Sequence, residues 1–207
     1  MKTILTCFAI VSLLISSCSE SSSKKIEIKN NPAPYFLPTP EKWTTEVFPV
    51  PPGFAAELPY KGTEEIRFAP GWSKPDSQDY WTYLFLWVID NATSITTDEL
   101  NNYLEVYYTG LAAINSKNKE SLEKDSFKTK SNMTLAKTEE NDQQTYQGNI
   151  QIMDYMRAEP LTLNCKVHIV KCNKSNSLFI FHELSPKPIT DTVWGDLSKI
   201  RKGFTCN

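Results

Sequence analysis

The chain has 207 residues and an almost balanced charge, with 22 basic and 24 acidic residues and a net charge of −2. Lysines and glutamates are interspersed and form no basic stripe, which argues against a nucleic-acid partner. The length suffices for one domain with a substantial core, and no internal repeat indicates a second.

The first residues, 1–17, have the pattern of an export signal. Lys2 is followed by an apolar run too short to anchor the chain across a bilayer, which leads into Ile15-Ser16-Ser17-Cys18. This ending resembles the lipobox of bacterial lipoproteins: an aliphatic residue, two small residues and a cysteine. The resemblance implies cleavage before Cys18, a diacylglyceryl thioether on its sulfur and acylation of the new amino group. The alternative is an ordinary secretory peptide with an incidental cysteine.

Residues 18–41 have the composition of a flexible tether. They are rich in serine and then in proline, and cannot bury enough apolar surface to fold. Ser19 after the cysteine resembles the pattern of lipoproteins sorted to the outer membrane, and the single acid Glu20 favours the face turned to the periplasm. We therefore expect a membrane-tethered envelope protein, lipid-anchored in the outer membrane and facing the periplasm, with one domain over 42–207.

The densest stretch of this domain is predicted to hold two antiparallel strands. One contains Ile66 and Phe68, and the other runs from Tyr80 to Ile89. Because successive side chains of a strand alternate faces, the second strand is apolar on both faces and is predicted to be central. The preceding stretch, Trp43 to Pro59, is rich in proline and aromatic residues and is predicted to be an irregular arm.

The elements that follow are read from periodicity and turn residues. The spacing of Thr96 and Glu99 matches a capping box, and an amphipathic helix is predicted from Thr97 to Asn115. A last helix is predicted up to Lys202, capped by Asp191 or Thr192. Between the helices, turn-forming linkers favour antiparallel hairpins of four strands, over 131–139, 145–156, 161–172 and 177–184.

Together these elements predict an α+β domain, with an antiparallel sheet of about six strands and a helix on each face. Their order resembles the PsbP-like fold, which is shared by extrinsic photosystem proteins and a Ran-binding import factor. The resemblance lies in topology alone and implies no functional residue.

Once Cys7 is removed with the signal, three cysteines remain besides Cys18. An oxidising compartment favours one disulfide, which we assign to Cys172 and Cys206. Cys165 lies on the apolar face of a predicted strand and is expected to be a buried thiol. The alternative is a zinc site, but no CxxC pair occurs, and we expect no metal.

The sequence contains few signals of catalysis. It has no nucleophile elbow, P-loop or dinucleotide fingerprint, and Ser121 and Lys124 fit a Ser-x-x-Lys pattern without its partner motifs. We therefore predict no catalytic residue and no cofactor. His168 and His182 lie on neighbouring predicted strands: one register would place them on one face, and a shift by one would separate them.

Aromatic residues are the best candidates for a binding site. Trp72, Tyr80 and Trp81 cluster in or beside the central strand, where rings with a polar group would suit a carbohydrate or peptide. Trp72 follows a proline and a glycine and is expected to be partly exposed. The alternative is that these rings fill the core.

The sequence therefore favours a non-enzymatic domain that binds a ligand or an envelope protein partner. The alternative is an envelope enzyme of the hydrolase type, or a remnant of one, with a site near Trp72, Asp76 and Tyr80; a carboxylate with a perturbed pKa in a pocket there would favour it.

One tripeptide suggests a modification. Asp191-Thr192-Val193 resembles the acceptor tripeptide of a periplasmic O-glycosylation system, which implies a glycan on Thr192, although these residues also suit a helix cap.

Overall fold

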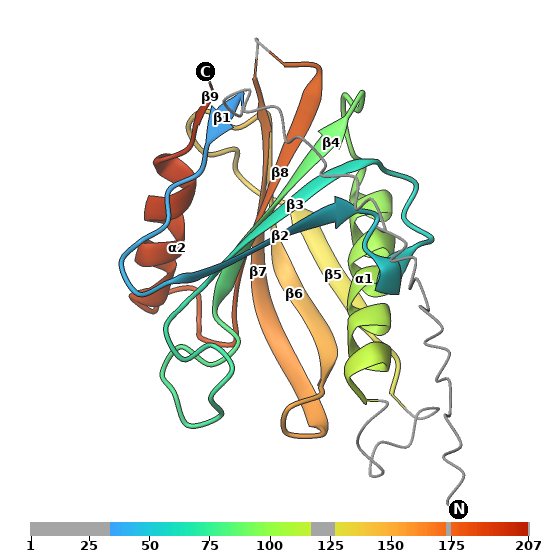
Figure 1. Ribbon diagram of the computed structural model, residues 1–207, viewed down its shortest axis with the longest axis vertical. Helices are drawn as coiled ribbons and strands as arrows, with labels where there is room; N and C mark the ends of the chain where they lie inside the picture. The colour runs from blue at the N-terminus through green and yellow to red at the C-terminus, as the bar shows by residue number, and fades with distance from the viewer. Residues whose placement is uncertain (1–33, 117–126, 173–174, 207) are drawn as a thin grey trace, which may run out of the picture. The chain divides into compact units, whose positions relative to one another are not determined.

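The computed structural model describes residues 34–116, 127–172 and 175–206 (Figure 1). Cys18, the Ser121–Lys124 pattern and most of the predicted tether lie outside the described residues. The main sheet is antiparallel, has seven strands and follows the order β2-β3-β4-β8-β7-β6-β5. Its strands are β2 (Thr44–Val50), β3 (Gly62–Phe68), β4 (Tyr83–Asp90), β5 (Lys130–Leu135), β6 (Gln144–Asp154), β7 (Glu159–Lys171) and β8 (Ser177–Ser185).

The remaining elements are two helices, a short 3-10 turn and a second, two-stranded sheet. They are α1 (Thr97–Ser116), α2 (Val193–Lys202), η1 (Gly53–Ala55), and the pair β1 (Tyr35–Phe36) and β9 (Thr205–Cys206). The described part of the chain is therefore a mixed α+β domain built on an antiparallel sheet, which confirms the predicted class.

Strand β4 occupies the predicted central position, between β3 and β8. Every residue from Tyr83 to Ile89 is buried, as expected for a strand that is apolar on both faces. The strand starts later than predicted, at Tyr83 rather than Tyr80, because Trp81 has a φ of 53°, in the left-handed region, which interrupts the extended backbone.

The two faces of β4 belong to different hydrophobic clusters, and Figure 1 shows α1 and α2 on opposite sides of the sheet. The first cluster includes Tyr83, Phe85, Trp87 and Ile89 of β4 with Leu100, Leu104, Tyr107 and Tyr108 of α1. The second cluster includes Leu84, Leu86 and Val88 of β4 with Val193, Trp194, Leu197 and Ile200 of α2. Each set of β4 side chains is therefore packed against its own helix.

Strand β2 corrects the sequence prediction, because it lies within the stretch expected to be an irregular arm. Its residues pair with β3 from Thr44 opposite Phe68 to Val50 opposite Gly62. Pro49 lacks an N–H and would break a central strand, but β2 lies at the edge of the sheet, where proline is tolerated. This strand brings the sheet to seven strands instead of about six.

The folded part of the chain also begins before residue 42, where the domain was predicted to start. Tyr35 and Phe36 pair with Cys206 and Thr205, and Leu37 is buried. The Arg67 guanidinium donates a hydrogen bond to the Leu37 carbonyl at 3.0 Å, which fixes this segment to β3. Residues 35–37 were assigned to the tether because a run of three apolar residues between Pro34 and Pro38 is too short to give a periodic signal.

Hydrogen bonds at the start of α1 confirm the predicted capping box, and those at the start of α2 decide between its two predicted capping residues. The Thr96 N–H donates to Glu99 Oε2 at 2.8 Å and the Glu99 N–H donates to Thr96 Oγ1 at 3.3 Å, which is a capping box. At α2 the Val193 N–H donates to Asp191 Oδ1 at 3.0 Å, whereas Thr192 makes no capping bond. Asp191 is therefore the capping residue, and the Thr192 side chain is exposed.

Candidate functional site

An aromatic cavity of about 250 Å³ opens between β2, η1, the end of α1 and the turns that precede β4. We call it the aromatic cavity, because eight of the twelve residues that line it are aromatic. The lining residues are Glu46, Phe48, Phe54, Ile66, Phe68, Trp72, Trp81, Tyr83, Tyr107, Leu111, Asn115 and Tyr155. A concave, mainly apolar site with few polar groups is the usual form of a small-molecule site.

The register of β2 and β3 places one side of the cavity. Glu46 pairs with Ile66 and Phe48 pairs with Glu64, so these side chains share one face of the sheet. Tyr107 and Leu111 of α1 line the same cavity, which identifies this face as the one toward α1. The sequence reading missed this contribution because it did not assign β2 to the sheet.

The turns before β4 place Trp72 and Trp81. The Trp81 N–H donates to the Trp72 carbonyl at 2.8 Å, which joins the two ends of the connection. The Trp72 ring stacks on Phe68 with centroids 4.2 Å apart, and it meets the Trp81 ring at 85°. The Trp81 ring meets Tyr155 edge to face at 5.2 Å. Trp72 is partly exposed, as predicted, and Trp81 is almost fully buried.

A close approach of η1 to α1 supplies the next side of the cavity. At Gly110 an added Cβ would lie 1.8 Å from the Phe54 carbonyl oxygen, so only glycine allows the two backbones to meet here. This contact holds the Phe54 ring edge to face against Tyr107, with centroids 5.0 Å apart, and 6.4 Å from Phe48. Phe48 and Phe54 lie in the stretch Trp43 to Pro59, which was predicted to be an irregular arm.

A buried carboxyl group lies next to the cavity. Glu64 is fully buried, and it accepts hydrogen bonds from the Trp87 indole N–H at 2.9 Å and from the Tyr107 hydroxyl at 2.6 Å. Burial raises the pKa of Glu64 to about 7, and the two hydrogen bonds act in the opposite direction. Sequence reasoning missed Glu64, although its inward position, two residues before Ile66 on the same strand face, was a usable signal.

Trp72, Asp76 and Tyr80, the residues of the alternative enzyme site, do not line the aromatic cavity together. The Tyr80 hydroxyl donates to Asp154, and its ring lies under the Arg157 guanidinium at 4.9 Å. Asp76 is fully exposed and lies 3.8 Å from Arg157. Neither Asp76 nor Tyr80 lines the cavity that Trp72 lines. Of the predicted binding residues Trp72, Tyr80 and Trp81, the cavity is lined by Trp72 and Trp81.

The two histidines lie on opposite faces of the sheet. His168 pairs with Phe181, whereas His182 pairs with Val167 and Phe85, so the register is the one that separates them. The His182 ring stacks on Phe85 at 4.0 Å, and burial lowers the pKa of His182 to about 3. Of the two registers left open by the sequence, the structure has the one that keeps the histidines apart, so they do not share a metal or a proton.

His168 belongs to a buried charged network that joins α2 to the sheet. Its Nδ1 lies 2.7 Å from Asp142 Oδ2, and Arg201 donates to Asp142 at 3.3 Å and to Glu183 at 3.2 Å. Burial lowers the pKa of His168, but the hydrogen bond to Asp142 and the Glu183 carboxylate 3.8 Å from Nε2 outweigh it, and the net shift is upward. Because His168 and Glu183 are fully buried, a substrate cannot reach them, and we assign the network to structure.

The cysteines also contribute to structure. Cys172 and Cys206 form a disulfide with Cα atoms 5.9 Å apart, and Cys165 is a buried free thiol whose pKa is raised by burial. Within the described ranges, no group of three or more His, Cys, Asp and Glu side chains is placed to hold a metal ion. Over the same ranges, no helix has the length and apolar character needed to cross a membrane.

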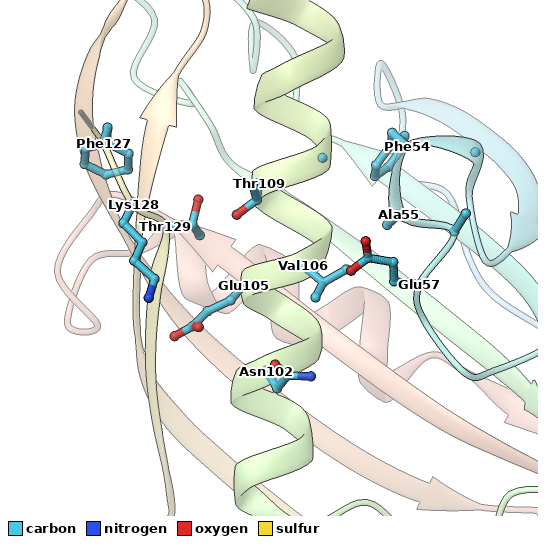
Figure 2. Close-up of a pocket in the computed structure, with 13 residues that line it drawn as sticks. Phe54, Ala55, Glu57, Asn102, Glu105, Val106, Thr109, Phe127, Lys128 and Thr129 are labelled. Carbon is cyan, nitrogen blue, oxygen red and sulfur yellow. The ribbon is translucent and has the colours of Figure 1, made fainter. Parts of the chain in front are cut away.

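A larger hollow of about 740 Å³ lies along the exposed face of α1 (Figure 2). Figure 2 shows Phe54, Ala55 and Glu57 on one side of the helix and Phe127 and Lys128 on the other. The helix separates these side chains, so they do not converge on one ligand position. The aromatic cavity is smaller, but its side chains face one another.

No family model matches the chain, and no curated protein matches it. Among solved structures, the chain is similar to LpqN, described as involved in cell envelope biogenesis of Mycobacterium tuberculosis. The two are 12% identical over 83% of this chain and 82% of that chain, with a TM-score of 0.31. A similarity this low carries no inference about the fold, site or activity of this chain.

Proposed function

We propose that this protein is a lipid-anchored envelope protein whose domain binds a small ligand in the aromatic cavity and does not catalyse a reaction on it. The observation that carries the proposal is the cavity itself, whose eight aromatic residues converge from β2, η1, β3, β4, α1, the connection between β3 and β4, and the turn after β6. Aromatic rings in a preformed cavity supply a large contact area at a low cost in conformational entropy.

The polar groups of the cavity favour binding over catalysis. The Tyr83 hydroxyl is hydrogen-bonded to Tyr108 and the Tyr107 hydroxyl to Glu64, so neither is free to act on a substrate. The lining residues include no serine, cysteine, histidine or lysine, which are the usual nucleophiles and bases. The cavity therefore offers mainly ring faces to whatever enters it.

Ligand-observed NMR with a panel of small apolar and amphiphilic fragments tests this proposal. The protein is the mature chain carrying Cys18→Ala, so that neither lipid nor detergent competes for the cavity. We expect several fragments to bind, and Trp72→Ala to abolish their binding. The matched control is Trp43→Ala, because Trp43 is also partly buried but packs in the second cluster, with α2. The proposal fails if no fragment binds, or if Trp43→Ala and Trp72→Ala reduce binding equally.

The anchor is proposed from the Ile15–Cys18 pattern and the tether that follows it. Lipid chains on Cys18 would hold the protein on the periplasmic side of the outer membrane, since each buried methylene contributes about 0.8 kcal/mol. We expect Cys18→Ala to move the protein from the membrane fraction to the soluble fraction, measured by immunoblot after a salt wash. Persistence of this variant in washed membranes would contradict lipid anchoring.

A further inference from the structure

We propose that the ligand of the aromatic cavity is a small organic ammonium cation, with the size and charge of a choline-like group; this inference rests on the proposed function. Glu46 is the single charged residue among the twelve that line the cavity, and it is acidic. The argument uses the charge of the cavity, the arrangement of its rings and its volume.

The charges near the cavity are negative. Glu46 is an exposed residue of β2 opposite Ile66, two residues before Phe48, which pairs with Glu64. The Glu46 carboxylate contributes to raising the pKa of Glu64 and of Tyr155, after the larger effects of burial and, at Tyr155, of Asp154. No lysine or arginine lines the cavity, and Arg157, which lies over Tyr80, donates to the Pro75 carbonyl outside the lining. An anionic ligand would therefore be repelled.

The rings are arranged to receive a positive charge. A cation within about 6 Å of a ring centroid is attracted by the negative face of the ring, most strongly by tryptophan. Trp72 and Tyr155 are partly exposed, and each meets the almost fully buried Trp81 between them, at 85° and 69°. A compact ammonium group can contact more than one face in such a corner, whereas a neutral polar ligand finds the Tyr83 and Tyr107 hydroxyls already hydrogen-bonded within the protein.

The volume favours a small free cation over a lipid headgroup. About 250 Å³ lies just below the range of about 300–1,000 Å³ that is typical of sites for drug-sized ligands. In a phospholipid the ammonium is followed by a phosphate, which would lie close to Glu46 and be repelled by it. We therefore commit to the free ammonium compound and use vesicles as a separate arm of the test.

The test compares choline with 3,3-dimethylbutan-1-ol, in which an uncharged carbon replaces the ammonium nitrogen at nearly the same shape. Binding to the mature chain carrying Cys18→Ala is measured by tryptophan fluorescence and ligand-observed NMR. We expect the neutral compound to bind roughly tenfold more weakly, the ratio given by cation–π attraction to two rings. Glu46→Gln should weaken choline binding several-fold and leave the neutral compound unchanged, whereas Glu41→Gln, an exposed acid outside the cavity lining, should change neither.

The outcomes separate this inference from the proposed function. Equal binding of the two compounds, with no effect of Glu46→Gln, would overturn the assignment of a cationic ligand but would still support an apolar binding cavity. Failure of both compounds together with the whole fragment panel would overturn the proposed function as well. Sedimentation with phosphatidylcholine vesicles, but not with phosphatidylglycerol vesicles, in the absence of free choline binding would assign the ammonium to a lipid and overturn the free compound.

Discussion

Replacing Glu64 with glutamine should make the free energy of unfolding less sensitive to a rise in pH. Glu64 is buried, its carboxyl oxygens accept hydrogen bonds from Trp87 and Tyr107, and burial raises its pKa from 4.5 to about 7. Glutamine has the shape of the protonated carboxyl group, can still accept from Trp87 and can donate to the Tyr107 hydroxyl, but it does not titrate. The variant therefore isolates the effect of the Glu64 proton.

The expected magnitude follows from proton linkage. Between pH 4.5 and 7 the folded protein retains the Glu64 proton while the unfolded chain has lost it, so the free energy of unfolding falls as the pH rises. A difference from 4.5 to about 7, at 1.36 kcal/mol for each unit, gives a loss on the order of 3 kcal/mol that is complete above pH 7. This is a large share of the roughly 5–15 kcal/mol that stabilises a typical domain.

Urea unfolding of the wild type, Glu64→Gln and the exposed control Glu41→Gln between pH 4.5 and 8 measures this effect. His168 and His182 titrate in all three proteins. The raised pKa of His168 gives stability that is lost above pH 6.5, and the lowered pKa of His182 gives stability that is lost as the pH falls from 6.5 toward 3. Both histidine contributions cancel when the wild type is subtracted. The free energy of unfolding of Glu64→Gln minus that of the wild type should therefore rise with pH, whereas the same difference for Glu41→Gln should stay flat. A flat Glu64→Gln difference would refute the reasoning.

Four further substitutions test the packing and the surface. Leu84→Ala and Phe85→Ala, at fully buried positions on opposite faces of β4, should each lower the free energy of unfolding, by about 2–5 and 3–5 kcal/mol, and an effect below about 1 kcal/mol at either would contradict coverage of both faces. Gly110→Ala should destabilise the domain and abolish fragment binding, although this change usually gains up to about 1 kcal/mol within a helix, because Phe54 would have to move. Thr192→Ala should remove a glycan from the intact mass of protein isolated from its own host, and an unmodified wild-type mass would contradict the acceptor reading.

The elements that could be predicted from sequence are those determined by local periodicity. The pattern along β4 fits only a central strand, because both of its faces are apolar and must be covered. Helix α1 starts at the predicted residue, since the Thr96 and Glu99 capping box is a short-range interaction encoded within four residues. The hairpins of β5 to β8 also follow from turn residues that adjoin the strands they connect.

The elements that could not be predicted depend on neighbours distant in sequence. Strand β2 contains Pro49, and only its place at the sheet edge makes a proline acceptable there. The register that separates His168 from His182 is set by the pairing of whole strands, because a shift of one residue would reverse the outcome. Trp81 is non-glycine with a positive φ, a conformation that no local pattern indicated.

The candidate site was partly predictable for the same reasons. Trp72 and Trp81 were identified from the density of aromatic residues in one stretch. Phe48 and Phe54 come from a stretch that gave no regular signal, and Tyr107 lies in the predicted amphipathic helix, which supplied no binding candidate. Glu64 was not identified, although it lies two residues before Ile66 on the same strand face and is fully buried.

The aromatic residues have a common structural cause. Helix α1 packs mainly on β5, β6 and η1, so it does not cover the β2 and β3 edge of the sheet with its full length. At that edge the covering layer is completed by large side chains from η1 and from the turns before β4, including Phe54, Trp72 and Trp81. Flat rings fill such a gap by edge-to-face and stacked contacts and leave concave space between them, unlike branched aliphatic side chains, which interdigitate. The cavity is therefore a consequence of how α1 is placed on the sheet, and the residues that complete the core at this edge are the same residues that would contact a ligand.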